Sequence, residues 1–146
     1  VVLNLADGAI GYLETEEENL KIFDRIAWSL KPGGQHFMDV CPADHARRHF
    51  PKRHWQAGKK ALALAAFEWD ENSRRMLYGG CSIPYGKPAV KPEITRGTST
   101  RLYSQEELEQ VLRERGMTPL ACYSDYAGNP ASTRELQLMM HSRKTA

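Results

Sequence analysis

The chain has 146 residues, of which 41% are hydrophobic and 26% are charged, and these values are typical of one folded domain. Its formal net charge of +2 is too close to zero to mark the whole chain as a nucleic-acid or membrane binder. No apolar run approaches the roughly 20 residues that cross a bilayer, and residues 1–5 lack the basic start of a secretion signal. We therefore expect a cytoplasmic protein.

Three cysteines, Cys41, Cys81 and Cys122, are the thiols of the chain. An odd, widely spaced set is typical of free thiols in a reducing compartment and not of a disulfide framework or a zinc site. We expect all three to be small buried side chains.

The first 41 residues predict a strand, a helix and a second strand. Residues 1–5 form an apolar run typical of a short buried strand. Thr15 and Glu18 have the spacing of a capping box, and the sequence 31–34 (KPGG) predicts the end of the helix. The apolar stripe of this helix comprises Leu20, Phe23, Ile26, Ala27 and Leu30. Residues 35–41 follow as a strand, and the short connections predict that the two strands are parallel.

The next segment is basic and then alternates in hydrophobicity. Residues 45–60 contain six lysines and arginines, three histidines and no carboxylate. Residues 61–69 and 74–83 predict an antiparallel ribbon, and a change of phase between Ala66 and Phe67 predicts a bulge. The prolines and glycines that follow predict a loop over residues 84–97.

The last third of the chain predicts one strand, one helix and two final strands. Residues 98–103 are expected to form a strand, and Ser104 with Glu107 forms a second capping box for a helix over 104–115. Its apolar stripe comprises Leu108, Val111 and Leu112. The final strands are expected at 117–126 and 133–141, on either side of a turn at Gly128-Asn129-Pro130.

Several short stretches occur in a distinctive order: 4–13 (NLADGAIGYL), 16–20 (EEENL), 30–34 (LKPGG), 37–40 (FMDV) and 101–108 (RLYSQEEL). In this order and spacing they resemble class I S-adenosylmethionine-dependent methyltransferases, over residues 1 to about 144. The resemblance implies a Rossmann-like, doubly wound α/β sheet of seven strands, with the last strand antiparallel and inserted beside the fifth. Residues 1–5 would be its fourth strand and residues 35–41 its fifth.

The chain resembles only the C-terminal half of that fold. The glycine-rich cofactor loop and the acidic residue that holds the ribose precede the fourth strand in this family, and neither is found in the chain. Three parts are expected: a strand–helix–strand unit at 1–41, a lid-like insertion with an antiparallel β-ribbon at 42–97, and a helix with the final strands at 98–146. We expect this chain alone to bind the cofactor poorly and to be inactive. Its open sheet edge could pair with a second copy.

The resemblance also implies a function and a place for the site. The complete enzyme would transfer a methyl group from S-adenosylmethionine to a nitrogen or oxygen atom of a small molecule. The main chain after the fourth strand would border the cofactor at Leu5 and Ala6, and Asp7 and Tyr12 would face the methyl acceptor. Structural roles are the alternatives: an Asx turn before Gly8 for Asp7, and a packed aromatic at the helix entry for Tyr12. Ligands of open parallel sheets lie at the carboxyl ends of the strands, which also makes Asp39 a candidate. Methyl transfer requires no metal, and no catalytic residue can be assigned.

The basic segment 45–60 allows other interpretations. Arg47, Arg48 or Arg53 could pair with a carboxylate of an anionic acceptor. The segment, in which Phe50 and Trp55 are interleaved, could also grip phosphates or stack on a base. A solvated cap on the lid is the simplest alternative. A competing hypothesis is a non-enzymatic module that binds RNA or an acidic partner, although nucleic acid is the less favoured partner. His45 and His49 have the spacing of zinc ligands on a helix, but the two arginines between them disfavour a dication.

Overall fold

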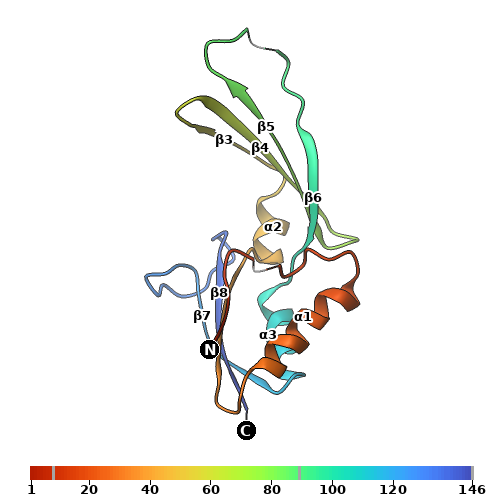
Figure 1. Ribbon diagram of the computed structural model, residues 1–146, viewed down its shortest axis with the longest axis vertical. Helices are drawn as coiled ribbons and strands as arrows, with labels where there is room; N and C mark the ends of the chain where they lie inside the picture. The colour runs from red at the N-terminus through yellow and green to blue at the C-terminus, as the bar shows by residue number, and fades with distance from the viewer. Residues whose placement is uncertain (8, 89, 146) are drawn as a thin grey trace.

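The computed structural model describes residues 1–7, 9–88 and 90–145, and within this part the strands form two four-stranded sheets (Figure 1). The first sheet has the order β1-β2-β8-β7 and the second has the order β3-β4-β5-β6. The elements are, in chain order, β1 (Val2–Asn4), α1 (Glu16–Ser29), β2 (Gln35–Val40), α2 (Ala43–His49), β3 (Lys52–Ala57), β4 (Ala61–Asp70), β5 (Arg75–Pro84), β6 (Thr95–Arg101), α3 (Gln105–Arg113), β7 (Met117–Tyr123) and β8 (Leu138–Lys144). None of the described helices is both long and apolar enough to span a membrane.

The first sheet has the connectivity expected from the sequence. β1 pairs with β2 in parallel, as the strand–helix–strand unit predicts. β8 is antiparallel to both of its neighbours and lies between β2 and β7. This confirms the last strand as the one inserted beside the strand at 35–40. The α/β class and the arrangement of the final strands are therefore as predicted.

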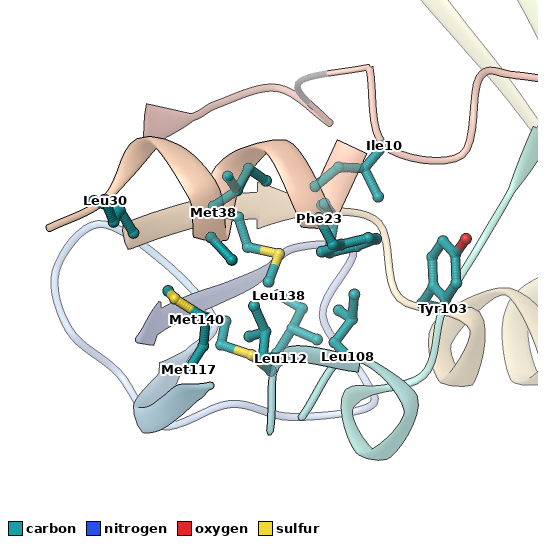
Figure 2. Close-up of a cluster of buried hydrophobic side chains, with 13 residues drawn as sticks. Ile10, Phe23, Leu30, Met38, Tyr103, Leu108, Leu112, Met117, Leu138 and Met140 are labelled. Carbon is teal, nitrogen blue, oxygen red and sulfur yellow. The ribbon is translucent and has the colours of Figure 1, made fainter. Parts of the chain in front are cut away.

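The main core lies between this sheet and the two longer helices (Figure 2). Met38 on β2 is paired with Met140 on β8, so these two side chains lie on the same face of the sheet. Phe23 from α1 and Leu112 from α3 pack against that face, and all four side chains are fully buried or nearly so. Met117 belongs to the same cluster, so that methionine fills much of this interior, and Met139 is buried outside this cluster.

Both predicted helix starts are confirmed. In α1 the Thr15 hydroxyl accepts a hydrogen bond from the Glu18 amide, and in α3 Ser104 and Glu107 are related in the same way. The end of α1 is capped from another part of the chain. Lys144 Nζ donates to the carbonyl oxygens of Ala27 at 2.6 Å and Leu30 at 2.8 Å, which places a cation at the negative end of the helix.

The second sheet, which we call the insertion sheet (β3–β6), is larger than the predicted two-stranded ribbon. β4 and β5 form the expected hairpin, but β3 and β6 add a strand on each side. Figure 1 shows this sheet projecting beyond α2, away from the first sheet. The bulge predicted between Ala66 and Phe67 is wrong, because the β4–β5 register is continuous there. The irregularity lies between Leu77 and Gly79 in the β5–β6 pair.

Other boundaries also differ from the predictions. β6 begins at Thr95, so that the predicted loop 84–97 ends earlier, and Ala89 of that loop lies outside the described residues. The strand expected at 133–141 begins only at Leu138, and the strand expected at 117–126 ends at Tyr123. The three cysteines are free and only partly buried.

The strand at 1–5 is not buried as predicted. Leu3 is 60% exposed and Leu5 is also exposed. The reason is the position of β1, which forms one edge of the described sheet and is paired on one side only. Apolar composition alone does not distinguish an edge strand from a central one.

Candidate functional site

Asp7 joins the carboxyl ends of the two parallel strands. Its amide donates a hydrogen bond to the carbonyl oxygen of Asp39 at 2.8 Å. Its carboxylate oxygen Oδ1 accepts from the amide of Cys41 at 3.0 Å. Ala6 and Asp7 both have a positive φ, of 52° and 65°, so the chain turns sharply where it leaves β1. The carboxylate is thereby held at the edge of the sheet where ligands of such folds lie.

Tyr12 lies beside Asp7. The Tyr12 hydroxyl donates to Asp7 Oδ2 over 3.4 Å, and the side chain is 48% exposed. Partial burial of the phenol and the adjacent negative charge of Asp7 raise the pKa of Tyr12 above its ordinary value. The structure therefore brings these two candidate residues together.

Asp39 supplies a second carboxylate at the same edge. Its side chain is only 5% exposed, and Oδ2 accepts hydrogen bonds from the Tyr126 hydroxyl at 2.9 Å and from Gln137 Nε2 at 3.3 Å. The bond to Asp39 raises the pKa of Tyr126. Sequence reasoning missed both partners of Asp39, since they lie in the connection between β7 and β8, far from Asp39 along the chain.

Leu5 and Ala6 lie at the end of β1, next to Asp7, and their contact with the cofactor stays a prediction. Both are exposed. They offer main chain and one apolar side chain to a ligand, which suits only one side of S-adenosylmethionine. In the described residues, β1 is followed by this strained turn and not by a glycine-rich strand-to-helix turn of the kind that holds a nucleotide. The residues present thus fit part of that cofactor.

Arg47 and Trp55 are found in other surroundings. Arg47 lies on α2 and bonds both carboxylate oxygens of Glu71, at 3.1 and 3.2 Å from Nε. Trp55 lies on β3, an outer strand of the insertion sheet, and is 67% exposed. None of the contacts that the structure gives for either residue within its described part involves Asp7, Tyr12 or Asp39. Their proposed contact with an acceptor stays a prediction.

The histidine pair on α2 stacks and does not form part of a larger donor set. The His45 and His49 rings are 4.4 Å apart, and burial together with His49 lowers the pKa of His45. In the parts of the chain that the structure describes, no group of three or more His, Cys, Asp or Glu side chains could hold a metal ion. Cys41 also offers no ready nucleophile, because burial and Asp7 raise the pKa of its thiol to about 12.

Comparison with known proteins identifies the fold. No protein-family model and no curated protein sequence matches the chain. Among solved structures, it resembles the CcbJ methyltransferase from Streptomyces caelestis with a TM-score of 0.77 and 13% identity, over 99% of this chain and 60% of that one. A S-adenosylmethionine-dependent methyltransferase from Clostridium acetobutylicum gives a TM-score of 0.74 and 11% identity, over 99% of this chain and 58% of that one.

A third similar structure was solved with S-adenosylmethionine bound. CalS10, an amino pentose methyltransferase from Micromonospora echinaspora, gives a TM-score of 0.59 and 12% identity, over 94% of this chain and 55% of that one. The chain therefore spans at most 60% of the length of these three structures. Together with the antiparallel last strand, these likenesses show that the chain has the fold of one part, and not of the whole, of a class I S-adenosylmethionine-dependent methyltransferase.

Proposed function

We propose that this chain is part of an enzyme that transfers a methyl group from S-adenosylmethionine to a nitrogen or oxygen atom of a small molecule. The observation that carries the proposal is the position of Asp7, which joins the ends of β1 and β2 and is contacted by Tyr12. The likeness of the fold to methyltransferases supports it.

The chemistry requires alignment and, for most acceptors, a place for a proton. When bound, the cofactor supplies an electrophilic methyl group, and the acceptor lone pair forms the new bond to carbon as the carbon–sulfur bond breaks. Leu5 and Ala6 would border the cofactor. The Asp7 carboxylate would orient the acceptor and receive the proton that it loses. Two bonds, from the Cys41 amide and the Tyr12 hydroxyl, fix the carboxylate for this role.

Among possible acceptors, an amine fits this edge of the sheet best. Asp7 and Asp39 present two carboxylates on adjacent strand ends, and no lysine or arginine among the described residues forms an ion pair with either. A protonated amine would be attracted there and would lose its proton before it attacks. Two of the similar structures act on nitrogen-bearing acceptors by name, an amino pentose methyltransferase and a glycopeptide N-methyltransferase.

The direct test is methyl transfer by the complete gene product. Labelled S-adenosylmethionine would be supplied together with panels of small amines, alcohols and carboxylates, and transfer to at least one amine is expected. Transfer to none of the panels would contradict the proposed function. Transfer to alcohols alone would contradict only the amine preference.

Replacing Asp7 by asparagine is expected to lower kcat/KM for an amine acceptor by about 100-fold or more, because the amide cannot receive a proton. Glu68→Gln is the matched control, since Glu68 is an exposed carboxylate that pairs with Arg53 in the insertion sheet. The control should retain normal kinetics. Unchanged kcat/KM in the Asp7 variant would contradict the proposal that the Asp7 carboxylate receives the proton.

The 146-residue chain by itself is expected to show no binding of S-adenosylmethionine up to about 1 mM, because it offers only one side of a cofactor site. Isothermal titration calorimetry on the isolated chain measures this directly. A dissociation constant in the micromolar range would show that residues 1–146 hold the cofactor on their own.

A further inference from the structure

The loop that carries Tyr12 is fixed to the first helix. Asn19, a fully buried residue of α1, donates from Nδ2 to the carbonyl oxygens of Leu13 at 3.1 Å and Thr15 at 2.8 Å. Its Oδ1 accepts from the Leu13 amide at 3.1 Å. One fully buried side chain of α1 thus holds the main chain immediately after Tyr12.

The same loop is also held from the insertion sheet. Arg75, the first residue of β5, donates from Nη2 to the carbonyl oxygens of Leu13 at 3.0 Å and Gly11 at 3.5 Å. Its Nη1 contacts the carbonyl oxygen of Glu14 at 3.4 Å. The guanidinium is anchored on β6 by Ser99, through the hydroxyl at 2.5 Å from Nε and the carbonyl oxygen at 2.9 Å from Nη2. The carbonyl oxygen of Leu13 therefore accepts from α1 and from the insertion sheet at once.

The partners of Arg75 distinguish it from its neighbours. Arg74 and Arg101 both form ion pairs with Glu107, at 2.6 and 2.9 Å. Within the described residues, Arg75 has only carbonyl and hydroxyl oxygens as partners. The planar fork of an arginine can bridge several carbonyl oxygens in fixed directions, which the single ammonium of a lysine cannot do. This arrangement holds main chain in place and neutralises no charge.

We propose that Arg75 is a positioning residue, which fixes the main chain on both sides of Tyr12 and so holds its phenol against Asp7 only while the insertion sheet is docked. Arg75 contacts the carbonyl oxygens of Gly11, Leu13 and Glu14, and so reaches main chain on both sides of Tyr12. The Gly11 carbonyl oxygen also accepts from the Arg101 amide of β6 at 2.8 Å. The proposal rests on the proposed function in one respect, namely that Asp7 and Tyr12 face the acceptor. If Arg75 has this role, the contact between Tyr12 and Asp7 depends on β5, which is distant from both residues in the sequence.

The titration of Tyr12 tests this proposal without any substrate. The complete gene product would be labelled with ¹³C-tyrosine, and the Tyr12 signal would be assigned with the Tyr12→Phe variant. In Arg75→Met the midpoint of Tyr12 is expected to fall toward the ordinary tyrosine value of about 10, because the phenol moves away from Asp7 into solvent. The midpoint of Tyr126, which is raised by a different carboxylate, should not change.

Two further variants complete the test. Arg53→Met removes an exposed arginine of the same sheet, one that pairs with Glu68, and should leave the Tyr12 midpoint as it is. Arg75→Lys is expected to shift the midpoint in the same direction as Arg75→Met, and it serves if the latter does not fold. An unchanged Tyr12 midpoint in a folded Arg75 variant would overturn the proposal. So would the failure of both Arg75 variants to fold, since Arg75 would then be needed for the fold itself.

The outcome is independent of catalysis. If the gene product transfers no methyl group but Tyr12 responds to Arg75 as described, the proposed function fails and the positioning role stands. If methyl transfer is found and the Tyr12 midpoint does not change, the proposed function stands and the positioning role of Arg75 fails.

Discussion

Replacing Gly11 by alanine is expected to lower the free energy of unfolding by about 2–5 kcal/mol, which is the sum of two costs. The φ of Gly11 is 84°, a conformation that is unfavourable for residues with a side chain. In addition, a Cβ atom at this position would lie 1.9 Å from the carbonyl oxygen of Arg101, where the loop meets β6. Main chain must therefore move on one side or the other.

Gly128→Ala separates the two costs. Gly128 has nearly the same φ, 86°, but a Cβ atom added there would meet nothing within 4 Å. This variant should lose only about 1–2 kcal/mol, the cost of the conformation itself. Urea unfolding of the two variants and the unmodified protein gives the comparison. Equal losses in both variants would show that the loop and β6 separate without cost, in conflict with a rigid connection between the insertion sheet and the loop.

His36 is expected to make the protein less stable in mild acid. It is fully buried, with Nδ1 3.1 Å from the Ser142 hydroxyl and Nε2 3.1 Å from Asn4 Oδ1. Burial lowers its pKa from 6.5 to about 4, so the folded protein favours the neutral ring. The associated stability is fully present above pH 6.5 and is lost as the pH falls from 6.5 to 4, because the unfolded chain then takes up a proton that the folded protein does not. The loss amounts to about 3 kcal/mol.

The variant His36→Gln keeps a polar side chain between the two strands but removes this titration. Between pH 7 and pH 4, its free energy of unfolding should fall by about 3 kcal/mol less than that of the unmodified protein, because the carboxylates contribute equally to both. His54→Gln, at an exposed position on β3, serves as the control for the removal of a histidine outside the core. If His36→Gln and the unmodified protein showed the same pH dependence, the His36 ring would not be neutral and buried in the folded state.

The parts of the fold that the sequence predicted are those with local causes. Thr15 with Glu18 and Ser104 with Glu107 are capping boxes within a single turn, so the starts of α1 and α3 could be located to the residue. The parallel pairing of β1 and β2 follows from the short connections of a strand–helix–strand unit. The position of β8 in the sheet was predicted from the family resemblance, because its local sequence does not indicate which strands it pairs with.

The insertion was predicted only in part, for the opposite reason. Every residue of β3 is exposed, and four of the five residues before Ala57 are polar or charged. The sequence therefore lacks the alternation of apolar and polar residues that predicts a strand. It is a strand because β4 offers it hydrogen-bonding partners. α2 is short, and its basic sequence also gave no clear periodic signal. Pairing between segments overrides local preference in such regions.

The residues of the site were likewise predicted where they lie close together in the sequence and missed where they lie far apart. Asp7 and Tyr12 were predicted from the family resemblance, and they lie only five positions apart in the sequence. Tyr126 lies 87 residues from Asp39, and Arg75 lies 62 residues from Leu13, so no pattern in the sequence could have joined them. Arg47 was assigned to the acceptor by its charge, whereas the structure gives it Glu71 as a partner.

The methionine-rich interior has a consequence for how this protein could be studied. Four of its five methionines, Met38, Met117, Met139 and Met140, are buried to 1% exposure or less, and Met38, Met117 and Met140 belong to the main core. Methionine is unbranched and fills irregular space, so this interior should tolerate changes in neighbouring side chains better than a core of branched residues. Isotope labels on the methyl groups of Met38, Met117 and Met140 would accordingly report on the packing between α1, α3 and the sheet. The methyl group of Met76, on β5, would report on the contact between the insertion sheet and α2.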